Sequence, residues 1–146
     1  PEPAQIEEHI EIRISLEKLA VEKSIEHLTD EGLAAIHDSL QAFEAALERK
    51  DYITCNELDS EFHLLIARLS QNGRLVKLLD EFSAFFQLIR KEEKKDSPQQ
   101  KNEITLNEHR QVAEAISNRD VMAAQQAVAA NIQTMRDTLL KGAEGE

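Results

Sequence analysis

Asp59 and His63 stand four residues apart in the segment LDSEFHLLIARLS, among apolar residues that recur at helical spacing. An Asp-x-x-x-His pair places both side chains on one face of an α-helix, where they can share a metal ion or bond to each other. The pair lies on the same face of the helix as the apolar stripe, and a carboxylate is costly to bury on that face unless it is paired. For an isolated pair, a local ion pair is the more common explanation.

Two other expected helices also carry a polar residue within an apolar stripe. His109 lies four residues before Ala113, and Asn131 lies three residues after Val128. Together with Asp59, these residues place one metal-capable or hydrogen-bonding side chain on the inward face of each of three helices. The cores of helix bundles are where helical proteins build metal and ligand sites, so the combination favours a buried site over a single ion pair.

Several other kinds of site have no support in the sequence. There is no His-Glu-x-x-His zinc-protease motif, no Glu-x-x-His pair of the usual di-iron bundle, and no glycine-rich phosphate loop. Cys55 is the single cysteine, so an internal disulfide is excluded and a reducing cytoplasm is the natural setting. His9, His27 and His37 stand beside charged residues, and we expect them to be solvated.

Length and composition indicate one folded helical domain. The chain has 146 residues, of which 41% are apolar and 31% charged, and its four glycines and three prolines leave few turn signals. A formal net charge of −11 repels phosphate, which makes the chain a poor candidate for binding DNA or an anionic membrane by itself. No apolar run has transmembrane length and no signal-peptide pattern is present. The start PEPAQ, without methionine, hints at an excised fragment.

The hydrophobic periodicity predicts an all-α fold, an antiparallel bundle of about six to seven helices with no strand. We expect Thr29 to cap the second helix, Asn72-Gly73 to form a turn, and the polar run RKEEKKDSPQQKN around Pro98 to be a long loop. The terminal GAEGE is expected to be frayed. The six clearest helices are expected at about 4–28, 30–47, 52–70, 75–89, 103–118 and 121–141.

Three blocks of sequence, in this order, resemble the ligand-binding FCD domain of FadR-type members of the GntR family of bacterial transcription regulators. EIRISLEKLAVEKS is similar to that domain's opening helix with its Arg-x-x-Leu-Glu signature. LDSEFHLLIARLSQN is similar to its Asp-x-x-Phe-His segment, and NEHRQVAEAISNRDVMAAQQAVAANI is similar to its closing pair of helices. The resemblance covers nearly the whole chain.

The resemblance implies a divalent metal, zinc or nickel, held by Asp59, His63 and His109. The fourth position of the family pattern, usually histidine, falls on Asn131, whose amide oxygen is a weaker ligand for these metals. The site is therefore expected to be weak, to complete its shell with water or effector, or to be a metal-free pocket. The resemblance also places Arg13 near the cavity, where it can bind an effector carboxylate. A surface pair with Glu17 is the alternative.

These observations predict that residues 1–146 form a single effector-binding and dimerisation domain, and that the chain is not an enzyme. The resemblance implies a cytoplasmic homodimer that binds a small carboxylate. DNA would be contacted only through an upstream winged helix-turn-helix domain, which is absent from this chain. Two alternatives remain: a metal-dependent enzyme on a helical bundle, and a plain dimerisation bundle with a buried polar network.

Overall fold

The computed structural model describes residues 2–91 and 97–144, and in these residues it contains six α-helices and no strand. The all-α prediction is therefore confirmed. The helices are α1 (Pro3–Glu26), α2 (Asp30–Glu48), α3 (Tyr52–Leu69), α4 (Gly73–Lys91), α5 (Pro98–Ser117) and α6 (Val121–Glu144).

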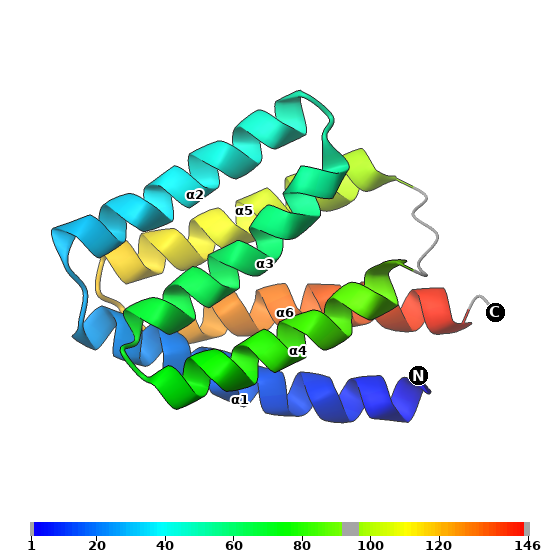
Figure 1. The fold of residues 1–146 in the computed structure, drawn as a ribbon, viewed down its shortest axis with the longest axis horizontal. Coiled ribbons are helices and arrows are strands. Elements are labelled where there is room, and N and C mark those ends of the chain that lie inside the picture. The colour runs from blue at the N-terminus through cyan, green and yellow to red at the C-terminus, as the bar shows by residue number, and fades with distance from the viewer. Residues whose placement is uncertain (1, 92–96, 145–146) are drawn as a thin grey trace.

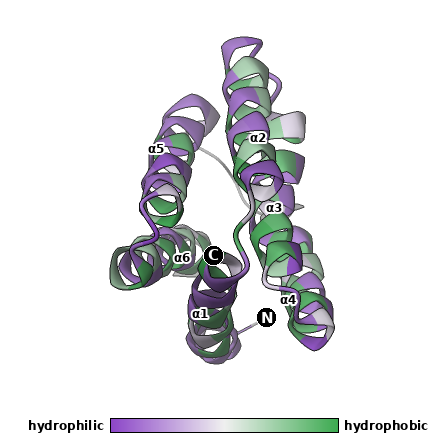
Figure 2. Ribbon diagram, turned by 90° about the vertical axis from the view of Figure 1, so that its left-hand side faces the viewer, coloured by the Kyte–Doolittle hydropathy of each residue, from purple (hydrophilic) through white to green (hydrophobic). Residues whose placement is uncertain are grey.

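The six helices form two layers of three, which Figures 1 and 2 show from perpendicular directions. Helices α2, α3 and α4 lie side by side in one layer, and α5, α6 and α1 form the other. Across the layers, α3 contacts both α1 and α5, while α4 contacts α1 and α2 contacts α5. Because α3 touches helices of both layers, its inward face lies at the centre of the bundle.

Three of the connections are tight turns built without glycine. The loops 49–51, 70–72 and 118–120 each place their middle residue, Lys50, Gln71 or Arg119, in the left-handed region with φ between 56° and 60°. In the loops after α2 and α5, the next backbone N–H donates to a carbonyl five residues earlier at 2.9 Å, which closes the helix end. A non-glycine residue in this conformation costs roughly 1–2 kcal/mol. The chain thus makes short antiparallel connections although it has only four glycines.

Side-chain caps begin the helices where the sequence predicts them. The Thr29 hydroxyl accepts a hydrogen bond from the Gly32 amide at 3.0 Å, as expected for an N-cap. The side chain of Asn72 accepts from the Leu75 amide at 3.1 Å, so this residue turns the chain by capping α4.

The predicted long loop around Pro98 is wrong at its C-terminal end. Pro98 is the first residue of α5, and the Ser97 hydroxyl caps the helix by accepting from the Gln100 amide at 3.4 Å. Proline suits this position because the first helical amides have no partner within the helix and the ring fixes a helical φ. Helix α5 therefore begins five residues before the expected Glu103; residues 92–96 of the predicted loop lie outside the described residues. Helix α6 reaches Glu144, so the first three residues of the predicted frayed end, 142–144, are helical, and residues 145–146 lie outside the described residues.

The apolar stripes meet between the layers. Phe62, Ile66, Ile116, Ala124 and Val128 are almost completely buried, and Figure 2 shows hydrophobic faces turned toward the interior. Polar and charged residues are buried in the same region, and they include Arg13, Glu17, Asp59, His63, His109 and Asn131. Among the described residues, no helix is long and apolar enough to span a membrane.

One histidine lies in a different environment from the predicted one. His27 and His37 are exposed, as expected, but His9 is half-buried and stacks on Phe85 with ring centroids 3.9 Å apart. Phe82 approaches the same imidazole edge-on at 5.4 Å. The apolar body of His9 therefore packs against α4, which charge patterns in the sequence did not reveal.

Candidate metal centre

Asp59, His63 and His109 converge between the two layers. Asp59 and His63 come from successive turns of α3, and His109 reaches them from α5. One ligand atom from each residue lies within 4.8 Å of the others. Asp59 Oδ1 is 3.0 Å from His109 Nε2 and 3.6 Å from His63 Nε2. The spacing on α3 and the contact between α3 and α5 thus bring together the three side chains proposed as ligands.

These separations suit a divalent metal. Ligand atoms bound at about 2.1 Å in tetrahedral geometry lie roughly 3.4 Å from one another. The separations of Asp59 Oδ1 from His109 Nε2 and from His63 Nε2, 3.0 and 3.6 Å, lie on either side of this value. In addition, His109 Nε2 is buried and makes no well-directed hydrogen bond, although Asp59 is close. A carboxylate and two imidazoles form a donor set that suits zinc or nickel, so the residues present fit such an ion.

The surroundings of His109 favour the neutral, metal-binding form of the imidazole. The side chain is 1% exposed and stacks on Phe62 with ring centroids 4.1 Å apart. Burial lowers the pKa of His109 below its ordinary value, although the neighbouring Asp59 acts in the opposite direction. A neutral imidazole keeps one nitrogen lone pair available for a metal.

Arg13 and Glu17 of α1 form a buried pair on the other side of His63. Arg13 Nε lies 3.4 Å from Glu17 Oε2, and the same oxygen lies 2.7 Å from His63 Nδ1. The i,i+4 pair considered in the sequence is therefore present, but it is in the core and not at the surface. Burial would raise the pKa of the Glu17 carboxyl, yet His63 and Arg13 together hold this pKa below its usual range. Glu17 therefore carries a negative charge inside the bundle.

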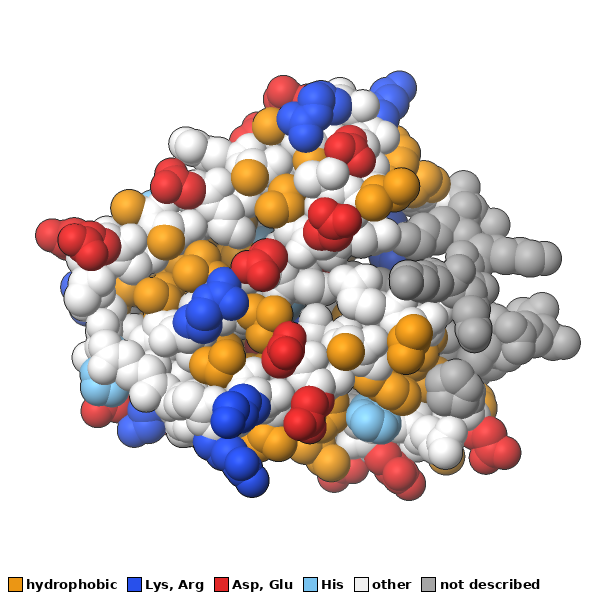
Figure 3. All heavy atoms as spheres, viewed as in Figure 1, with side chains coloured by type: hydrophobic (Ala, Val, Ile, Leu, Met, Phe, Trp, Pro, Cys, Tyr) orange, Lys and Arg blue, Asp and Glu red, His pale blue; other side chains and the backbone are white. Residues whose placement is uncertain are grey.

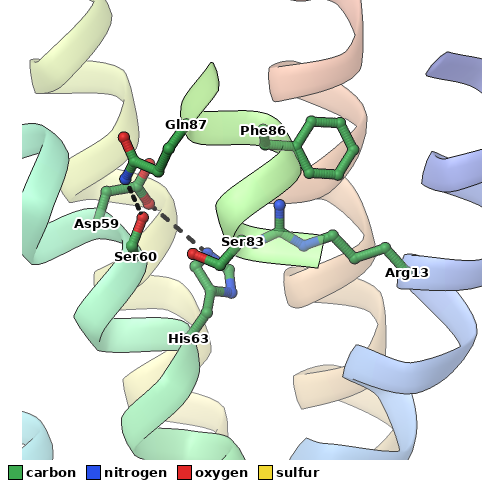
Figure 4. A pocket seen from close by; sticks show the side chains of 7 residues that line it. All are labelled: Arg13, Asp59, Ser60, His63, Ser83, Phe86 and Gln87. Atoms are coloured by element: carbon green, nitrogen blue, oxygen red, sulfur yellow. Dashed lines mark hydrogen bonds and ion pairs between the residues drawn. The ribbon is translucent and has the colours of Figure 1, made fainter. Parts of the chain in front are cut away.

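A small pocket opens beside these residues (Figure 4). Its space measures about 190 Å³, including the part open to solvent. Figure 4 shows Arg13 extending from α1 toward α4, with Asp59 and His63 opposite it on α3. The guanidinium of Arg13 lies over the Phe86 ring, 5.1 Å from its centroid. The pocket is lined by Arg13, Asp59, Ser60, His63, Ser83, Phe86 and Gln87.

Asn131 is buried on α6, but its side chain hydrogen-bonds to Glu108 and not to any of the three proposed ligands. Its amide nitrogen donates to Glu108 Oε1 at 3.0 Å, and the Thr134 hydroxyl donates to Glu108 Oε2 at 2.6 Å. Glu108 directly precedes His109 on α5. Position 131 therefore lies against the helix that carries His109, with its amide turned toward the preceding residue.

Sequence reasoning missed Glu17 as part of the site, together with the α4 residues Ser83 and Gln87. A signal for Glu17 was available, because Ile10, Arg13 and Glu17 follow one another at steps of three and four, as in a core-facing stripe. No such signal marks the α4 residues. They line the pocket because α4 packs against both α1 and α3, which only the fold reveals.

Comparison with known proteins agrees with this architecture. Residues 8–134 match the sequence profile of the FCD domain. The chain is 30% identical over 127 residues to YdhC of Bacillus subtilis (strain 168), an uncharacterized HTH-type transcriptional regulator. The match covers 86% of the chain but 56% of YdhC, so the chain spans about half the length of that curated relative.

Two solved structures share the fold. McbR/YncC of E. coli superposes with a TM-score of 0.84 at 20% identity, covering 94% of this chain and 65% of that one. The metal-free FCD domain of TM0439 superposes with a TM-score of 0.76 at 20% identity, covering 100% of this chain and 99% of that one. Since the FCD profile matches most of the chain and its relatives are transcriptional regulators, the chain belongs to the FCD domain family of GntR-type transcription regulators.

Proposed function

We propose that this FCD domain senses a small carboxylate through a metal-containing pocket and alters DNA binding by a separate domain. The observation that carries the proposal is the convergence of Asp59, His63 and His109 beside Arg13 in the interior of the bundle. Two imidazoles, a carboxylate and a guanidinium together form a site for an anion and a cation. The relatives are transcriptional regulators, which supports a sensing role over an enzymatic one.

Asp59, His63 and His109 would hold zinc or nickel as three protein ligands. When bound, the ion supplies a concentrated positive charge that attracts oxygen atoms of an anionic ligand. Because Asn131 donates to Glu108, the fourth coordination position is left for water or for an effector oxygen. The departure of position 131 from histidine thus favours a site that is open toward its ligand.

Arg13 would bind the effector carboxylate. Its planar guanidinium offers donors in a fork that matches a carboxylate, and it is held from one side by Glu17 and from another by the Phe86 ring. The space beside Arg13, about 190 Å³ including the part open to solvent, is not an enclosed cavity, so the small organic acid is proposed from the chemistry of Arg13 and not from a volume.

Arg13 also provides a route from the pocket to the helix packing. From α1 it touches Phe86 of α4 and its NH1 group lies 3.6 Å from the Met135 sulfur of α6. An effector that draws the guanidinium toward itself must alter these contacts, and α1 packs extensively on α6. Such a change in packing would alter the spacing of two DNA-binding domains in a dimer.

The surface supports a division of labour between sensing and DNA binding. On the face drawn in Figure 3, basic side chains are interspersed with acidic ones, and the whole chain carries a net charge of −11. The side chains of Ile12 on α1 and Leu88 on α4 are 54% and 66% exposed, which is consistent with a surface covered in a homodimer. We therefore propose a cytoplasmic homodimer whose DNA contacts are made by an additional domain. Sedimentation should show dimers, and gel shifts with this chain alone should be blank.

Metal analysis and thermal-shift measurements test the sensing role together. The chain, stripped with a chelator and reloaded with zinc, is expected to bind one ion per protomer and to be stabilised by small carboxylic acids. The primary amide of each acid is the matched control, because it keeps the size but loses the charge that Arg13 recognises. Arg13→Lys should weaken the response to acids, since lysine keeps the charge next to Glu17 but lacks the fork.

Other outcomes would change the proposal in defined ways. Stabilisation by acids without zinc binding would leave a metal-free pocket as the sensor. Zinc binding with no response to any acid would refute the carboxylate part. If neither zinc nor acids bind, the buried groups form only a polar network in a dimerisation bundle.

A further inference from the structure

Among the residues that the structure describes, Glu17 is the buried acid beside the candidate centre that is not one of its three proposed ligands. Its side chain is 1% exposed, and a carboxylate in such surroundings is stable only if it is paired. It has two partners, Arg13 in its own helix and His63 in α3, and both meet the same oxygen, Oε2. Of the two contacts, the one to His63 is the shorter, at 2.7 Å against 3.4 Å.

The two nitrogens of His63 face different partners. Nδ1 lies 2.7 Å from Glu17 Oε2, whereas Nε2 lies on the other edge of the ring, 3.6 Å from Asp59 Oδ1. Glu17 therefore lies at the Nδ1 edge of the ring, and Asp59 lies at the Nε2 edge. The contact between His63 Nδ1 and Glu17 Oε2 is close, although its donor direction departs from that of an ideal hydrogen bond.

We infer that Glu17 is a positioning residue that keeps the proton of His63 on Nδ1 and turns Nε2 toward Asp59 and His109. A neutral imidazole carries one proton, so fixing it on Nδ1 leaves the lone pair on Nε2. Carboxylates commonly orient metal-bound histidines in this way, by accepting the second ring N–H. The inference deepens the proposed function, on which its metal-binding consequence rests.

A purely structural role for Glu17 makes different predictions. If the carboxylate served only to neutralise Arg13, its removal would destabilise the fold without affecting which nitrogen of His63 is protonated. The shorter distance to His63, and the placement of that residue's other nitrogen toward the proposed ligands, argue for the positioning role.

Two substitutions of Glu17 separate these roles. Glu17→Gln removes the charge but keeps an oxygen that can accept from Nδ1, whereas Glu17→Met removes charge and acceptor at similar length. Glu108→Gln is the matched control, because it makes the same chemical change in the neighbouring network that holds Asn131. Circular dichroism identifies any variant that fails to fold. If Glu17→Met does not fold, the spectra of the wild type and of Glu17→Gln still test the inference.

The first measurement needs no metal. Long-range proton–nitrogen correlation spectra of isotope-labelled, metal-free protein show which nitrogen of His63 carries the proton, at a pH where imidazoles are neutral. We expect Nδ1 protonation in the wild type, in Glu17→Gln and in Glu108→Gln, and loss of this preference in Glu17→Met. Protonation of Nε2 in the wild type, or an unchanged spectrum in Glu17→Met, would overturn the inference.

The second measurement is the affinity for zinc alone. Glu17→Met should weaken zinc binding by about 10–100-fold, the range typical for loss of such an orienting partner. Glu17→Gln should lose less, and Glu108→Gln should bind like the wild type. Equal zinc affinity in the wild type and Glu17→Met would refute the role of Glu17 in metal binding. If even the wild type binds no zinc, the metal part of the proposed function fails, and the His63 spectra still decide the orienting role.

Discussion

Two groups of polar side chains lie close together in this bundle, one half-buried around Asn131 and one buried around His109, and their hydrogen bonding is different. In the network of Glu108, Asn131 and Thr134, the amide and the hydroxyl each donate to one carboxylate oxygen, at 3.0 and 2.6 Å. In the cluster of Asp59, His63 and His109, ligand atoms face one another at 3.0 and 3.6 Å, and His109 Nε2 makes no well-directed hydrogen bond.

We propose that the difference separates a structural group from a functional one. Buried polar groups in folded proteins are almost always hydrogen-bonded, and an exception calls for an explanation such as a bound ion. The network of Glu108 satisfies its members and ties α5 to α6 without any ligand. The cluster around Asp59 instead brings one ligand atom from each of three residues within 4.8 Å of the others, a spacing that a metal ion could bridge.

The largest expected effect is on zinc binding when a member of the cluster is changed. Asp59→Asn keeps the size of the side chain but removes the charged ligand, and it should weaken zinc binding by more than about 100-fold, beyond the usual effect of an orienting residue. Isothermal titration with zinc measures this change. Comparable weakening by Glu108→Gln would show that the two groups act as one site, which would contradict the comparison.

A histidine at position 131 should convert a member of the network into a ligand. Asn131 is one helical turn before Met135, whose sulfur contacts Arg13, so it lies on the face of α6 near the pocket. Asn131→His should tighten zinc binding on the order of tenfold, because imidazole is a better donor than an amide oxygen and would complete a tetrahedral set. Unchanged affinity would show that position 131 belongs only to the Glu108 network.

The helical elements and the central residues of the cluster could be predicted from the sequence for a physical reason. Apolar residues at steps of three and four determine the inward face of each helix, so Asp59, His109 and Asn131 were recognisable as polar residues within such stripes. The start of α5 was not predictable in the same way, because Pro98 reads equally as a helix breaker and as a first helical residue.

The pairing of polar residues could not be read from single helices. That Asn131 donates to Glu108, and that Glu17 contacts His63, depends on how α5 meets α6 and how α1 meets α3. Helix spacing gives the direction of a side chain about its own axis, but the partner across an interface depends on the relative positions of two helices.

The stability of the metal-free protein should depend on pH through His109. Burial lowers the pKa of His109, and the neighbouring His63 lowers it further, while Asp59 and Glu17 raise it by less. As the pH falls, the histidine therefore takes up its proton at a higher pH in the unfolded chain than in the folded one. The free energy of unfolding should therefore be highest above a pH of about 6.5, the ordinary value for histidine, and should decrease below it. Urea unfolding at a series of pH values measures this slope. His109→Asn should reduce it, and an unchanged slope would argue against burial of a neutral imidazole.

The smallest expected effect concerns the satisfied network alone. Thr134→Val replaces the hydroxyl by a methyl group of similar shape and keeps the β-branched side chain, so helix propensity and packing change little. It removes the hydrogen bond to Glu108 and should lower the free energy of unfolding by about 1 kcal/mol. Zinc affinity should stay at the wild-type value, because Asn131 still holds the other oxygen of Glu108. A loss of zinc affinity without a loss of stability would reverse the assignment, since the network would then support the centre and not the fold.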